Sequence, residues 1–167
     1  MPSIRTFAII GVSETKSLFL AKQIAKTNQV LLFDLNAATL LEVQTQILLE
    51  NPEANVEMMI CPTNASWEAD VIILSNYAAT DTNLAEKVRK VATGKVVLVL
   101  VNEMNPVIFE NPADKFQLLF PFSKVIQSIE STDDLKESLF LKGNDADALK
   151  TILTLFAGIG FKTNILI

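Results

Sequence analysis

The sequence predicts a three-layer α/β fold with a mostly parallel sheet and helices on both of its faces. Short apolar runs alternate with amphipathic segments of helical period along the 167 residues. The apolar runs are continuous rather than alternating, which is typical of parallel strands buried on both faces. Half of the residues are hydrophobic, enough to fill the core of such a fold.

Each element follows from its local pattern. The run at 96–101 is the most apolar and is expected at the centre of the sheet, whereas Glu57 interrupts the third run and marks it as an edge strand. The last run is apolar and is a second candidate edge, where a homodimer would form. Strands are predicted at 6–10, 30–33, 56–60, 71–74, 96–101, 125–129, 138–141 and 161–167. Helices are predicted at 15–26, from the cap Asn36 to Asn51-Pro52, from 80–82 to Gly94, at 113–120, and from Asn144 or Asp145 to Gly158.

The composition excludes several classes of function. The net charge is -5 without a Lys/Arg cluster, which argues against nucleic acid and anionic membrane surfaces as partners. There is no histidine, so catalysis by Ser-His-Asp or Cys-His groups is excluded, and a lone cysteine, Cys61, makes neither a thiolate metal cage nor an internal disulfide. We therefore expect no metal site. With neither a signal peptide nor a membrane span recognisable, we expect a cytoplasmic protein.

The segment after the first strand resembles a phosphate-binding turn. In the pattern G-x-G-x-x-G, only the first glycine is present, as Gly11, and the other two places hold Ser13 and Lys16. Two interpretations stay open. Amide groups at the helix N-terminus still bind a phosphate, helped by hydroxyls and by the charge of Lys16, or Ser13 crowds the diphosphate and the turn is only structural.

Asp34 favours the first interpretation. It ends the second strand, at the place where dinucleotide-binding proteins carry an acid for the adenosine ribose hydroxyls. A carboxylate there repels the extra phosphate of NADP, so NAD is slightly favoured over NADP. The alternative is an aspartate that only caps the following helix.

These features together resemble the N-terminal domain of coenzyme F420-dependent NADP oxidoreductases, which pyrroline-5-carboxylate reductases share. The resemblance rests on Ala8-Ile9-Ile10-Gly11, the stretch 67–74, Gly94-Lys95-Val96-Val97, Asn105-Pro106, the stretch 138–145 and the closing Gly158-Ile159-Gly160-Phe161.

The resemblance implies a Rossmann fold that spans residues 1–167 as a single NAD(P)-binding domain, without the helical second domain of the reductases. It implies that the cofactor contacts Gly11, Ser13, Glu14, Thr15 and Lys16 through its phosphates, Asp34 through the ribose, Ser75, Asn76 and Tyr77 after the fourth strand, and Asn102 and Asn105 near the nicotinamide.

We therefore expect an NAD(P)-dependent oxidoreductase whose partners are a dinucleotide and a small-molecule substrate. The sequence identifies neither the substrate nor the catalytic residues. One alternative is a non-catalytic interaction or nucleotide-sensing protein with a degenerate turn. Another is a CoA-binding domain, because a Gly-x-Ser turn occurs there too.

Overall fold

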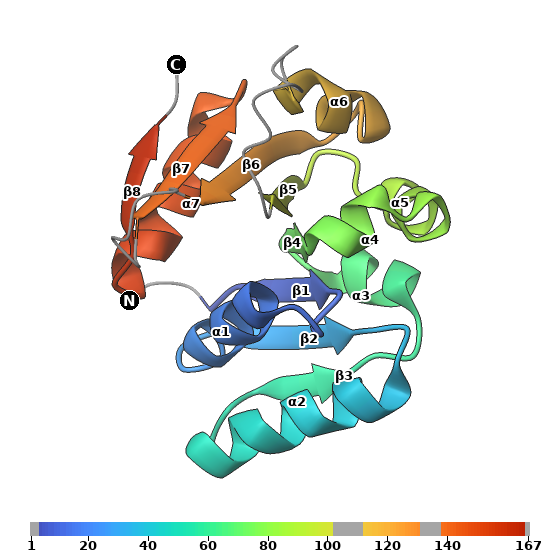
Figure 1. Ribbon diagram of the computed structural model, residues 1–167, viewed down its shortest axis with the longest axis vertical. Helices are drawn as coiled ribbons and strands as arrows, with labels where there is room; N and C mark the ends of the chain where they lie inside the picture. Colours follow the sequence, from blue (N-terminus) through green and yellow to red (C-terminus); the bar gives the residue numbers. More distant parts are fainter. Residues whose placement is uncertain (1–3, 102–111, 131–137, 166–167) are drawn as a thin grey trace.

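The strands lie side by side in one sheet with the order β3-β2-β1-β4-β5-β6-β7-β8, which Figure 1 shows from β3 at the bottom to β8 at the upper left. This computed structural model describes residues 4–101, 112–130 and 138–165. Neighbouring strands are parallel except β6 and β7, which are antiparallel. The strands are β1 (Thr6–Ile10), β2 (Gln29–Phe33), β3 (Val56–Met58), β4 (Val71–Leu74), β5 (Val96–Val101), β6 (Lys124–Glu130), β7 (Ser138–Gly143) and β8 (Lys162–Ile165).

Helices cover both faces of this sheet, as the sequence predicted. Apolar residues of α1, α2 and α7 pack on one face, and those of α3, α4, α5 and α6 pack on the other. Successive strand residues serve the two layers alternately, because Phe7 and Ile9 face the first and Ala8 and Ile10 the second. The helices are α1 (Thr15–Ile24), α2 (Ala37–Glu50), α3 (Pro62–Glu68), α4 (Asn76–Thr80), α5 (Thr82–Arg89), α6 (Pro112–Leu119) and α7 (Ala146–Gly158).

Polar side chains set most of the helix starts. Asn36 accepts hydrogen bonds from the amides of Ala38 and Thr39 at the start of α2, Asp81 caps α5, and Asp145 caps α7. Of the two residues predicted as the last cap, Asp145 is therefore the one used. The central place of β5 and the edge positions of β3 and β8 are also confirmed.

Two local predictions were wrong. The third strand ends at Met58 rather than at residue 60, and Ile60 is exposed. Helix α7 ends at Gly158 as predicted, but Gly160, with φ of 87°, and not Gly158 is the glycine that takes the left-handed conformation after it.

Among the described residues, no helix is long and apolar enough to cross a membrane.

Candidate functional site

The order of the strands places a topological switch point between β1 and β4. Strand β2 lies on one side of β1 within the sheet, and β4 lies on its other side. In open parallel sheets, ligands bind at such a point, in the crevice outside the carboxyl ends of the strands. The predicted phosphate-binding turn follows β1, and the predicted stretch from Ser75 to Tyr77 follows β4, so the fold brings these two segments together.

Gly11 allows the turn to pass close to the end of β4. Its φ is 86°, in the left-handed region, and its amide donates to the Phe33 carbonyl over 2.8 Å. A Cβ at this position would collide with the Ser75 hydroxyl. Ser75 is itself fully buried, and its Oγ accepts from the Ala78 amide at the start of α4. The buried Ser75 side chain therefore packs directly against the Gly11 turn.

Asp34 lies beside the same turn. Its Oδ2 atom accepts hydrogen bonds from the amides of Val12 at 2.9 Å and Ser13 at 3.1 Å. Its Oδ1 atom accepts from the Asn36 amide at 2.9 Å. These three hydrogen bonds fix the carboxylate at the carboxyl end of β2, next to the glycine turn, which is the place the sequence predicted for it.

One amide at the start of α1 is available to a ligand. Glu14 occupies the N-cap position, but its side chain does not cap the helix. The N–H group of the exposed Thr15 has no acceptor among the residues that the structure describes, whereas Ser17 is fully buried. The start of this ten-residue helix therefore offers a donor and the positive end of a helix dipole, which suit a phosphate.

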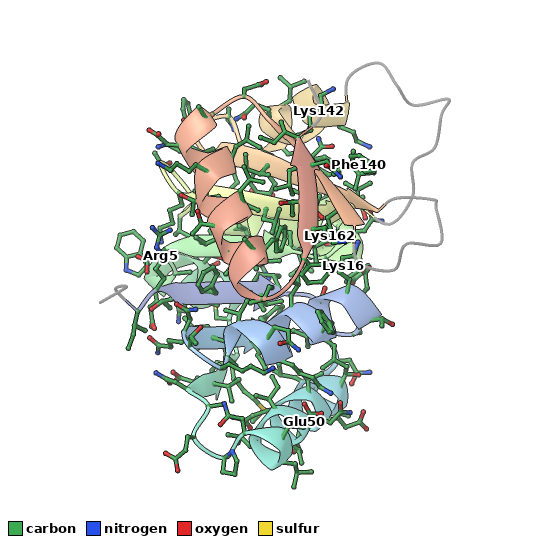
Figure 2. All side chains as sticks on the ribbon, turned by 90° about the vertical axis from the view of Figure 1, so that its left-hand side faces the viewer. Arg5, Lys16, Glu50, Phe140, Lys142 and Lys162 are labelled. Carbon is green, nitrogen blue, oxygen red and sulfur yellow. The ribbon has the colours of Figure 1, made fainter. Side chains whose placement is uncertain are left out.

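The predicted phosphate ligands differ in how far they reach this space. Ser13 and Thr15 are exposed. The Nζ atom of Lys16 is buried, at the end of α1 that Figure 2 shows near Lys162 of β8. The helix and the start of β8 are in contact, because the rings of Phe19 and Phe161 lie 5.3 Å apart. Lys16 thus turns inward and does not project into solvent.

Glu14 reaches across the crevice. Its Oε2 atom accepts from the Asn76 amide at 3.3 Å, and its Oε1 atom accepts from the Tyr77 amide at 3.2 Å. The sequence carries no signal for this contact, because the partners are 62 and 63 residues apart. The Glu14 carboxylate, which the resemblance placed at the phosphates, therefore binds the amides at the start of α4.

Tyr77 is partly exposed on that wall. Its hydroxyl donates to Asp81 Oδ2 over 3.3 Å. Desolvation, together with the negative charge of Asp81, raises the pKa of the Tyr77 phenol above its ordinary value. The phenol is therefore protonated at neutral pH and acts as a hydrogen-bond donor. Asn76 beside it is half-buried, and the predicted nicotinamide contacts Asn102 and Asn105 lie outside the described residues.

A separate cavity of about 600 Å³ lies at the opposite edge of the sheet. It runs between α7 and residues at the start of β1 and β2. Figure 2 shows Arg5, one of its lining residues, on the side of the molecule opposite to Lys16. Its position at the amino ends of β1 and β2 separates it from the crevice. Among the described residues, no group of three or more acidic or cysteine side chains is placed to hold a metal ion.

Comparison with known proteins defines the class of fold. No protein-family model and no curated protein matches the sequence. A solved structure of a candidate F420-dependent NADP reductase from Arthrobacter superposes with a TM-score of 0.77 at 20% identity, over 97% of this chain and 84% of that one. A hypothetical protein from Sinorhizobium meliloti gives 0.68 at 19% identity, over 98% and 85%.

An imine reductase from Myxococcus stipitatus, solved in complex with NAD+, superposes with a TM-score of 0.69 at 13% identity. This match covers 98% of the present chain and 55% of the longer reductase. At these identities the similarity shows the fold, so the chain has the Rossmann fold. The predicted resemblance to F420-dependent NADP reductases is confirmed at the level of structure.

Proposed function

We propose that this chain binds a nicotinamide dinucleotide in the crevice between β1 and β4 and acts as an NAD(P)-dependent oxidoreductase. The observation that carries the proposal is the free start of α1 above the Gly11 turn, with Asp34 fixed at the end of β2. The amide of the exposed Thr15 and the dipole of α1 would hold the diphosphate, and Asp34 would face the adenosine ribose. Residues 1–167 would form one dinucleotide-binding domain of a cytoplasmic protein.

The chemistry suits a chain without histidine. When bound, the nicotinamide supplies or accepts the hydride, so the protein has to bind and orient rather than transfer protons with an imidazole. The turn after β1 positions the diphosphate. The protonated Tyr77 hydroxyl lies on the β4 wall, where it would donate a hydrogen bond to the ribose or to a substrate oxygen.

Direct titration tests the proposal. NADH or NADPH fluorescence should change on addition of the protein, and either nucleotide should raise its thermal unfolding midpoint, since a ligand that binds only the folded state stabilises it. CoA serves as a control because it shares the adenosine diphosphate but lacks the nicotinamide, and it should give a smaller shift. The absence of any response to both nicotinamide nucleotides would refute the proposal, and a response to CoA alone would favour a CoA-binding domain.

We further propose that NAD(H) is preferred over NADP(H) because of Asp34. Both carboxylate oxygens accept backbone hydrogen bonds, so the negative charge is held in place at the end of β2. The 2′-phosphate of NADP would have to approach this charge. At a few ångströms in a partly exposed site, such repulsion is worth more than about 1.4 kcal/mol, or roughly tenfold in affinity.

Asp34→Asn should therefore improve NADPH binding relative to NADH by about tenfold, measured as the ratio of the two dissociation constants. The single amide oxygen of asparagine can still accept from the amides of Val12 and Ser13, whereas the hydrogen bond from the Asn36 amide is lost together with the charge. Asp70→Asn is a matched control, because Asp70 also accepts a backbone hydrogen bond, from the Thr6 amide, but at the amino end of β1. An unchanged ratio in Asp34→Asn would show that this carboxylate does not face the ribose.

A further inference from the structure

The hydrogen bonds of Glu14 join the two walls of the crevice. Glu14 directly precedes α1, whereas Asn76 and Tyr77 begin α4. The two hydrogen bonds, at 3.3 and 3.2 Å, are at the long end of the usual range for N–H donors. Glu14 is partly exposed, so water competes for both its oxygens and its partner amides. The contact is therefore a bridge that can open without unfolding any element of the sheet.

The bridge places a second negative charge at the phosphate-binding turn. Asp34 holds the amides of Val12 and Ser13 on the β2 side, and Glu14 reaches out on the β4 side. Two carboxylates therefore flank the turn that leads into α1. A diphosphate that binds at the start of α1 brings two further negative charges into the same crevice, where the low-dielectric sheet beneath strengthens repulsion.

We propose that Glu14 is an affinity-determining residue that acts as an internal competitor of the cofactor diphosphate. In the chain without nucleotide, its carboxylate closes the crevice by holding the amides of Asn76 and Tyr77. Binding of the diphosphate requires this carboxylate to swing away, so Glu14 lowers the affinity for every diphosphate ligand of the site. This inference rests on the proposed function, because it assumes that the diphosphate occupies the crevice.

The contact also explains how two turns keep their spacing without a bound ligand. Gly11 packs closely against Ser75, and Glu14 joins the start of α1 to the start of α4. Removal of the charge should therefore change two observable properties together. The affinity for anions should rise, and the amides of Asn76 and Tyr77 should lose protection from hydrogen exchange.

The test compares Glu14→Gln with the wild type by titration with NADH and, separately, with inorganic pyrophosphate. We expect the dissociation constants of both ligands to fall by about tenfold in Glu14→Gln. Glu42→Gln is the matched control, because Glu42 is exposed on α2 and changes the net charge equally without touching the crevice. Its dissociation constants should equal those of the wild type.

Amide exchange by NMR supplies a readout independent of the cofactor. In Glu14→Gln, exchange at Asn76 and Tyr77 should accelerate, while exchange in β1 and β4 should stay at the wild-type rate, which also shows that the variant is folded. Equal or weaker pyrophosphate binding in Glu14→Gln would overturn the inference. If neither chain binds NADH while Glu14→Gln gains pyrophosphate affinity, the proposed cofactor is wrong and the role of Glu14 stands.

Discussion

Replacing Gly11 with alanine is expected to destabilise the protein by about 2–5 kcal/mol and to abolish nucleotide binding. Two effects add at this position. The φ of 86° strains any residue with a Cβ, and that Cβ would collide with the buried hydroxyl of Ser75. Relief of the collision has to push the β1 turn away from β4, which moves the amides at the start of α1. Urea unfolding gives the stability, and NADH titration gives the binding.

Two other glycines separate these effects. Gly94 has a φ of 75° but open space around its Cβ position, so Gly94→Ala should lose only about 1–2 kcal/mol from strain. Gly158 is helical with open space, and Gly158→Ala should leave stability unchanged or raise it by about 0.5–1 kcal/mol. Both variants should bind NADH as the wild type does. A loss in Gly11→Ala no larger than that in Gly94→Ala would refute the close approach of the two turns.

Phe156→Ala is expected to lower the free energy of unfolding by about 3–5 kcal/mol. Phe156 is fully buried on the inner face of α7, within the layer that also holds α1 and α2. Its ring lies 5.6 Å from that of Phe161, at an interplanar angle of 60°. The truncation leaves a cavity under α7 and removes the support of Phe161, so the edge strand β8 should lose protection from hydrogen exchange first.

Phe19→Ala is the control for this prediction. Phe19 also contacts Phe161, but 43% of it is exposed, so its loss should cost only about 1 kcal/mol. Urea unfolding of the three chains measures the difference. A loss in Phe156→Ala as small as that in Phe19→Ala would mean that α7 is not packed into the core as described.

The elements of the fold could be predicted because their signals are local. Strands buried on both faces need apolar residues at every position, and the run at 96–101 has them. Caps such as Asn36 act within three residues of their own position. The end of α7 at Gly158 was predicted correctly, but the glycine that takes the left-handed conformation was not, since Gly158 and Gly160 are both suitable and only packing decides between them.

The site was predictable only in part. Gly11 and Asp34 follow adjacent strands, so the topology alone brings them together, and their neighbourhood could be inferred from spacing. The contacts of Glu14 with Asn76 and Tyr77, and the position of Ser75 beneath Gly11, depend on how β4 is seated beside β1. No periodicity or composition records such a nonlocal relation. The two missing glycines likewise do not reveal that Lys16 turns inward.

The antiparallel pairing of β6 with β7 has a consequence for the order of folding during synthesis. After the reversal, the chain returns through α7 to the first helix, where Phe161 meets Phe19. Helix α1 thus receives part of its apolar cover from a residue made long after it. On the ribosome, the strands and helices that begin the sheet should therefore remain loosely packed until Phe161 has emerged.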